Sequence, residues 1–175
     1  MAAARILYGA PSSSRTNKVT WMAAELGLSY SHVKRPTSLL RADPAYLRLN
    51  PKATVPTYVE RSGASEFVLN ESNSIVAYLA RRYGGRGSLY PASIERAALC
   101  WQWQEYGESS IQPACSPVWW GYMSGSGYPL GPGGALVPLD HDRLAAASDK
   151  ALAAFSVLNS HLSDGRSFML GEDLT

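Results

Sequence analysis

The sequence has few residues of the kinds that mark metal, redox or disulfide-rich proteins. Its 175 residues include two cysteines, Cys100 and Cys115, which lie far apart and form no C-x-x-C pair. The three histidines are also widely spaced, so no local metal site is expected. We therefore predict a protein without a metal cofactor, and a reducing cytoplasm is its default location.

Long apolar runs and an excess charge of one sign are also missing. The formal net charge is +2 and the basic residues are scattered, which argues against a nucleic-acid partner. The first residues lack the apolar core of a signal peptide, and no stretch is long enough to span a membrane. What remains is a chain with 46% hydrophobic residues, enough for one large domain or two small ones.

Strand and helix patterns alternate over residues 1–83. Period-2 stretches and short apolar runs indicate strands, whereas apolar residues at helical spacing indicate helices. The expected order is βαβ(α)ββα, that of a small α/β domain. The strands are expected at 4–9, 30–35, 55–60 and 66–70, and the helices at 15–28, 41–50 and 71–85.

Beyond residue 91 the pattern is helical only. We expect an aromatic-rich helix over 92–112, which Pro113 and Pro117 should kink or end. A Gly/Pro-rich loop follows at 123–138, and strong helical periodicity returns over 141–162. The predicted organisation is an α/β domain over 1–83, a linker over 84–91 and an all-α domain over 92–175.

Three short motifs could carry chemistry, and each also has a plain structural interpretation. "GAPSSSRTNKV" places three serines at a strand-to-helix corner, where helix capping explains only one of them. "NPKATVP" contains a Val-Pro bond, for which an ordinary trans proline at a strand start is favoured on this segment alone. "NESNSI" opens a helix, where Glu71 could pair with an ammonium and Ser72 with a carboxylate, as in an α-amino acid; capping is the alternative.

Taken in order, these motifs resemble the cytosolic glutathione S-transferase superfamily. The matching stretches are "LYGAPSSSRTNKVTWMAAELGLSY", "YLRLNPKATVPTYVE", "LNESNSIVAYLARRYG" and "ALAAFSVLNSHLSDGRSFMLGEDLT", which cover the chain from end to end. The serine run is similar to that of serine-type classes (phi, theta and zeta), as in bacterial-type members. The resemblance implies a thioredoxin-like first domain, a helical second domain, glutathione as cosubstrate, no metal and a cytoplasmic homodimer.

The resemblance also implies a catalytic residue that stabilises the glutathione thiolate. Counting back from Val19, Ser13 falls at the catalytic serine of the serine-type classes. Ser14 is the alternative if the alignment slips by one residue, and Tyr8 is the alternative from the tyrosine-type classes. Arg15 could add positive charge near the sulfur.

For glutathione itself, the resemblance points to two segments. Val55 matches the residue whose backbone pairs with the cysteinyl unit, ahead of the family's cis-proline, here Pro56. Glu71 and Ser72 match the pair that binds the γ-glutamyl end. Other expected contacts depart from the usual family residues and are Thr54, Lys52 and, for the glycyl carboxylate, Arg41.

For the hydrophobic electrophile, we expect contacts from Tyr106, Trp119 and Trp120, whose alternative role is core or interface packing. The chain stops at Thr175, where the family begins its buried sixth helix, so we expect it to be part of a longer protein. The expected activity is attack of the glutathione thiolate on a hydrophobic electrophile, as in detoxification. The alternatives are a non-catalytic interaction scaffold, as in translation factors and synthetases, and a glutathione-dependent isomerase or dehalogenase.

Overall fold

The computed structural model describes residues 3–85, 89–125, 140–172 and 174 of the chain. Its contacts divide the chain into two compact units, Met1–Tyr90 and Pro91–Thr175. The division falls inside the expected linker, of which residues 86–88 lie outside the described residues. The loop expected at 123–138 lies mostly outside them too, and so does Thr175.

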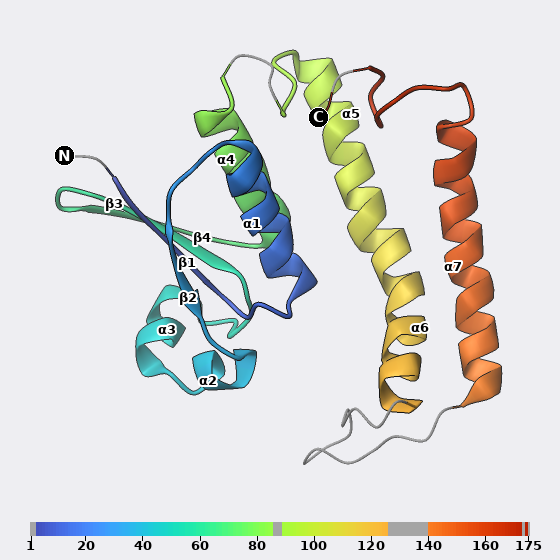
Figure 1. Ribbon diagram of the computed structural model, residues 1–175, viewed down its shortest axis with the longest axis horizontal. Coiled ribbons are helices and arrows are strands. Elements are labelled where there is room, and N and C mark those ends of the chain that lie inside the picture. Colours follow the sequence, from blue (N-terminus) through green and yellow to red (C-terminus); the bar gives the residue numbers. More distant parts are fainter. Residues whose placement is uncertain (1–2, 86–88, 126–139, 173, 175) are drawn as a thin grey trace. The chain divides into compact units, whose positions relative to one another are not determined.

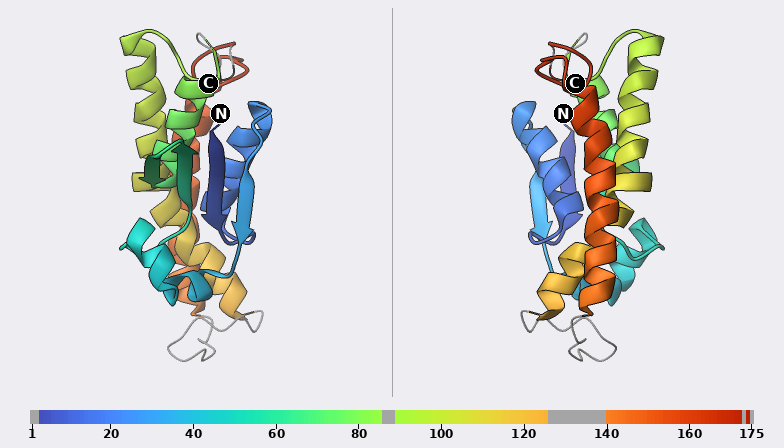
Figure 2. Two further views of the ribbon diagram at one scale, coloured as in Figure 1. Left: turned by 90° about the vertical axis from the view of Figure 1, so that its left-hand side faces the viewer. Right: turned by 90° about the vertical axis from the view of Figure 1, so that its right-hand side faces the viewer.

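The first unit is built on a four-stranded mixed sheet with the order β2-β1-β3-β4. Strand β1 runs parallel to β2 and antiparallel to β3, and β3 runs antiparallel to β4. Figures 1 and 2 show α1 and α4 on the same side of this sheet. The elements are β1 (Ala4–Gly9), α1 (Ser14–Glu25), β2 (Ser31–Lys34), α2 (Thr37–Arg41), α3 (Pro44–Leu49), β3 (Thr57–Ser62), β4 (Ser65–Asn70) and α4 (Ser72–Tyr83).

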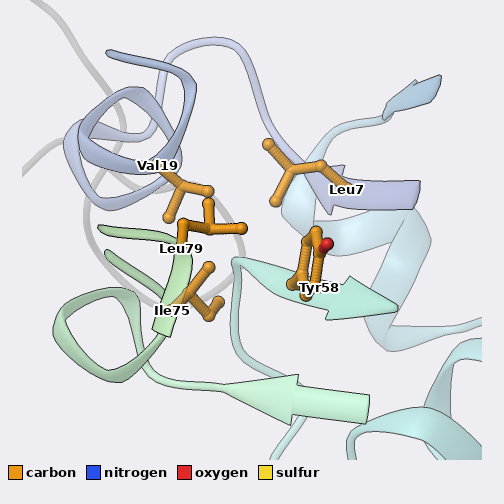
Figure 3. Packing of buried hydrophobic residues seen from close by; sticks show 5 residues of the cluster. All are labelled: Leu7, Val19, Tyr58, Ile75 and Leu79. Carbon is orange, nitrogen blue, oxygen red and sulfur yellow. The ribbon is translucent and has the colours of Figure 1, made fainter. Parts of the chain in front are cut away.

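A small hydrophobic core joins one face of the sheet to α1 and α4. Leu7 of β1 and Tyr58 of β3 are paired across the sheet, so their side chains point to the same face. There they meet Val19 of α1 and Ile75 and Leu79 of α4 (Figure 3). All five side chains are at most 2% exposed. Burial of this size is the main stabilising contribution to a domain of this length.

The second unit consists of helices in the described part of the chain. A long helical segment comprises α5 (Ile94–Tyr106), a π-helical stretch (Gly107–Ile111) and α6 (Gln112–Gly125). It packs along α7 (His141–His161), as Figure 1 shows. The expected fold, a thioredoxin-like α/β domain followed by a helical domain, is confirmed.

Two prolines do not end the aromatic-rich helix as expected. The helix continues through Pro113 and Pro117, and Pro117 lies inside α6. Immediately before Pro113 the winding widens, and the Gln112 N–H bonds to the Gly107 carbonyl, five residues back. Because proline has no N–H to donate, a local change of register absorbs it without stopping the helix.

Several element boundaries also differ from the expected ones. Strand β3 begins at Thr57, after the proline, and the hairpin turn is only Gly63 and Ala64, with Gly63 at a φ of 59°. Helix α2 was not expected from the sequence; it starts without a side-chain cap and has only five residues. The Val55-Pro56 bond is cis, as the resemblance implied and against the trans bond favoured on the segment alone.

Candidate functional site

The strand register brings the predicted site segments to one end of the sheet. Tyr8 in β1 is paired with Thr57 in β3, and Thr57 is paired with Asn70 in β4. The serine run follows β1, the "KATVP" loop precedes β3, and Glu71 follows β4. All three segments therefore leave the sheet at the same end of its strands, although they are far apart in the sequence.

Ser13 caps helix α1 at this end of the sheet. Its backbone is extended (φ −81°, ψ 118°), and its hydroxyl oxygen accepts a hydrogen bond of 3.3 Å from the Thr16 N–H. Ser13 is half-buried, whereas Ser12 and Ser14 are exposed. The N-terminus of an α-helix carries a partial positive charge and attracts anions. Of the three serines, Ser13 is therefore the one that combines a partly sheltered hydroxyl with the helix N-terminus.

The start of α1 lies unusually close to the end of β1. A Cβ added to Gly9 would come within 2.5 Å of the Cγ2 and Oγ1 atoms of Thr16. Thr16 is fully buried, so it has little room to move. Gly9 therefore permits the close approach that sets the position of the helix N-terminus and of its cap.

His32 lies beside the same strand end. Its Nε2 atom is 3.2 Å from the Gly9 carbonyl oxygen. Burial lowers the pKa of His32, outweighing the opposite effect of that hydrogen bond. The imidazole is therefore neutral at physiological pH, with the proton on Nε2 donated to the carbonyl.

Buried hydrogen bonds hold the loop that precedes β3. The Asn50 amide donates to the Thr54 carbonyl at 2.8 Å, and its Oδ1 accepts from the Lys52 N–H at 3.2 Å. The Tyr46 hydroxyl also donates to the Thr54 carbonyl. Asn50 and Tyr46 are at most 1% exposed. The Asn50 and Tyr46 side chains thus hold the backbone on either side of Ala53, directly before Val55.

Glu71 and Ser72 stand at the start of α4. Glu71 has a φ of 71°. Residues other than glycine rarely adopt this backbone conformation, and those that do are concentrated at functional sites. The Glu71 carboxylate forms an ion pair with the Lys52 ammonium across the loop. Ser72 is 4% exposed and occupies the first turn of the helix. A carboxylate and a helix N-terminus with a hydroxyl therefore adjoin each other.

The remaining candidates of the first unit lie around this end of the sheet. Arg41 donates from Nε to the Ala53 carbonyl at 3.0 Å, which places it on the loop before β3. Arg15 is exposed in the first turn of α1. Tyr8 lies on the opposite face of the sheet from Leu7, and its ring packs 5.6 Å from that of Tyr46. Tyr8 therefore packs away from the face that α1 covers.

The three candidates for the electrophile belong to the second unit. The Tyr106 hydroxyl donates to the Ala154 carbonyl at 2.9 Å, and its side chain lines a hollow of about 490 Å³ between the helices. Trp119 and Trp120 are 59% and 48% exposed on α6 and do not line this hollow. The structure therefore does not bring the three residues together at one pocket.

Residue-by-residue reasoning missed the groups that support the loop. Tyr46, Asn50 and Thr57 are buried polar residues that bond to one another or to Thr54. In the sequence, Asn50 before Pro51 looks like a turn residue, and nothing marks it as buried. Their hydrogen bonds join α3 and the residue after it to the start of β3, and only the folded structure reveals them.

No group of three or more His, Cys, Asp or Glu side chains in the described part of the chain is arranged to hold a metal ion. Among the described helices, none is both long and apolar enough to cross a bilayer.

Comparisons with known proteins agree with this geometry. Residues 7–87 match the model of the glutathione S-transferase N-terminal domain. Glutathione S-transferase stcT of Emericella nidulans is 30% identical over 171 residues, which are 97% of this chain and 69% of that protein. The chain thus aligns with its relative over both units.

Solved structures show the same fold. The theta-class glutathione S-transferase of Xanthomonas axonopodis pv. citri, solved with glutathione bound, is 29% identical with a TM-score of 0.77, over 97% of this chain and 75% of that one. The transferase URE2P8 of Phanerochaete chrysosporium is 24% identical with a TM-score of 0.80, over 100% and 74% of the two chains, and supports the fold alone. Because glutathione S-transferase stcT is 30% identical over 97% of this chain and 69% of its own length, and the family model matches residues 7–87, the chain belongs to the glutathione S-transferase family.

Proposed function

We propose that this chain is a glutathione transferase of the serine type, which activates the glutathione thiolate for attack on a hydrophobic electrophile. The observation that carries the proposal is the meeting of Ser13, Val55 and Glu71–Ser72 at one end of the sheet. Under the family resemblance, each would contact one part of a γ-glutamyl-cysteinyl-glycine ligand. Family membership supports the same activity.

Ser13 would stabilise the sulfur. Its oxygen accepts the Thr16 N–H, and this bond does not use the hydroxyl proton, which can be donated to a thiolate. The thiolate, not the thiol, is the nucleophile. Its sulfur forms a bond to the electrophilic carbon of a chloro-dinitrobenzene, and chloride leaves with the bonding electron pair. Ser14 and Tyr8 remain alternatives, but Ser14 is exposed and Tyr8 packs on Tyr46.

The γ-glutamyl end would bind at the start of α4. Its carboxylate suits Ser72 and the helix N-terminus, and its ammonium suits Glu71. Lys52 now holds the Glu71 carboxylate, so it must release at least part of that contact when the ligand binds. Freed from Glu71, the Lys52 ammonium could bind a ligand carboxylate.

The other tripeptide contacts follow the loop before β3. The Val55 backbone, ahead of Pro56, would pair with the cysteinyl unit, and Thr54 is exposed beside it. Arg41, which is anchored to the Ala53 carbonyl, would meet the glycyl carboxylate. Arg15 would add positive charge near the sulfur from the first turn of α1.

The finer features of the proposal concern partners and location. We expect Tyr106, Trp119 and Trp120 to contact the electrophile, Tyr106 foremost because it lines a hollow. A homodimer, a cytoplasmic location and a detoxification role are typical of the family. Isomerase or dehalogenase activity would use the same thiolate, and substrate profiling separates it from conjugation.

The test is turnover of chloro-dinitrobenzene by purified protein. Ser13→Ala should lower kcat/KM by about 100-fold, the usual effect of losing one preorganised donor to a developing or stabilised anion. Ser14→Ala is the matched control and should stay within about twofold of the wild type. A large loss in Ser14→Ala alone would move the catalytic role to that residue. Near wild-type rates for both variants would remove the serine run from the mechanism.

The rival scaffold hypothesis makes a different prediction. A non-catalytic interaction module would bind protein partners but would not be retained on a glutathione column. Retention of the wild type, with elution by free glutathione, supports the transferase. Failure to bind the column, together with no turnover, would favour the scaffold.

A further inference from the structure

A row of polar side chains runs beneath the proposed glutathione site. Tyr46, Asn50 and Thr57 are buried, with exposures of 1%, 0% and 0%. The Thr57 hydroxyl lies at their centre. It is 2.8 Å from the Tyr46 hydroxyl and 3.1 Å from the Asn50 amide nitrogen, and it donates to Asn70 Oδ1 at 2.9 Å.

This row connects the two segments that would grip the ligand. On one side, Asn50 and Tyr46 both donate to the Thr54 carbonyl, one residue before Val55. On the other side, Asn70 is the last residue of β4 and directly precedes Glu71. The Thr57 hydroxyl therefore links the Thr54 carbonyl, through the Asn50 side chain, to the side chain of Asn70, the residue directly before Glu71.

Because its side chains are polar, this row constrains the positions of the two segments. A buried polar group left without a partner destabilises the fold, so the groups keep their partners only if both segments hold their positions. An apolar side chain of the same shape would fill the space equally well but would place no constraint on the loop. Buried, fully bonded networks rigidify the structure around them in this way.

We propose that Thr57 is a positioning residue of the site: its hydroxyl fixes the Val55 backbone relative to Glu71 and Ser72, so that one tripeptide can contact both. This inference rests on the proposed function, since glutathione is the ligand that spans the two segments. Ser13 is positioned separately, by the close approach of α1 to Gly9. Thr57 therefore governs glutathione affinity and leaves the chemical step largely unchanged.

The test compares two substitutions of opposite character. Thr57→Val keeps the shape and removes the hydroxyl, whereas Thr57→Ser keeps the hydroxyl and removes a methyl group. With chloro-dinitrobenzene, Thr57→Val should raise the KM for glutathione about tenfold and leave kcat within about threefold. Thr57→Ser should restore a KM within about twofold of the wild type. Thr20→Val is a matched control, because in the part of the chain that the structure describes that hydroxyl bonds only to the Asn17 carbonyl, and its KM should not change.

A merely structural role gives a different pattern. If Thr57 only fills space, valine will retain the wild-type KM, and any loss of folded protein will lower kcat alone; that result overturns the inference. If Thr57→Val does not fold, Asn70→Ala, at the half-buried end of the row, must raise the KM for glutathione, and an unchanged KM overturns the inference. A wild type that does not bind glutathione overturns the proposed function as well, so the two failures are distinguishable.

Discussion

The two units of the chain differ in where they keep their large apolar side chains. In the first unit, Leu7, Val59 and Ile75 are at most 1% exposed. Among the described residues of the second unit, the buried hydrophobic ones are the small Cys100, Ala147 and Ala151. Many of its larger apolar residues lie on the helix surfaces: Ile94, Leu99, Trp101, Trp119, Trp120, Leu152, Phe155, Val157 and Leu162 are all at least 39% exposed.

The two units therefore differ in how they bury apolar side chains. A sheet covered on one face by two helices excludes water from a central cluster of large side chains. In the described part of the second unit, the most deeply buried apolar side chains are small. Substitutions in the first unit should therefore lower the stability of the fold and disturb the geometry of the site at the end of the sheet. Substitutions at the exposed aromatic positions of the second unit should act mainly through whatever binds there.

The most direct test of this difference compares two isoleucines, one from each unit. Ile75 is 0% exposed in α4, and Ile94 is 84% exposed at the start of α5. Ile75→Ala should lower the free energy of unfolding by about 4 kcal/mol because it leaves a cavity in the core. Ile94→Ala should change it by less than about 0.5 kcal/mol. Urea unfolding followed by circular dichroism measures both, and equal losses would show that the second unit buries Ile94 after all.

A second prediction concerns the close approach at Gly9. The new Cβ of Gly9→Ala would stand 2.5 Å from the Thr16 side chain, which is fully buried. We expect a loss of about 2 kcal/mol in stability from overpacking. Because α1 must shift, turnover should also fall. Gly107→Ala is the matched control, since a Cβ there meets nothing within 4 Å; wild-type stability in Gly9→Ala would contradict the crowding.

A third prediction uses the carboxylate at the far end of the sheet. Glu60 accepts hydrogen bonds from Tyr58 at 2.9 Å, Tyr78 at 3.2 Å and Tyr83 at 2.6 Å. Burial by itself would raise the pKa of Glu60, but these bonds and the charge of Arg5 outweigh it, so the pKa lies below its ordinary value of 4.5. The ionised form therefore stabilises the fold above that value, and this stabilisation is lost as the pH falls below it.

The variant Glu60→Gln isolates this contribution. At neutral pH it should be less stable than the wild type by about 1–2 kcal/mol, the loss expected for hydrogen bonds to a charged group. The gap should narrow as the pH falls below 4.5, since the wild-type carboxylate then becomes protonated. Thermal unfolding over this range measures the gap, and a constant difference would mean that Glu60 does not titrate with folding.

Local sequence features predicted much of the first unit. Capping and helical spacing located α1 and α4, and the Gly-containing hairpin located β3 and β4. Ser13 is the cap that explains one serine of the run, with its oxygen on the Thr16 N–H. Such features could be predicted because they depend on neighbours within one or two turns of the chain.

What the sequence could not predict depends on distant pairings. Asn50 and Thr57 owe their burial to strands and helices that meet only in the folded unit. The continuation of the helix through Pro113 follows a widened turn directly before that proline, which no local propensity reveals. The ion pair of Lys52 with Glu71 joins residues 19 positions apart. For the same reason the family resemblance, and not the residues alone, placed the tripeptide contacts.

The most direct test of the central claim is the pKa of the glutathione thiol when it is bound to the protein. Ultraviolet difference absorbance of the thiolate, followed against pH, gives this value. A free cysteine thiol titrates at about 8.5, and we predict a bound value at least one unit lower in the wild type, returning toward about 8.5 in Ser13→Ala. An unshifted thiol in the wild type, or the same lowered value in Ser13→Ala, would contradict the account.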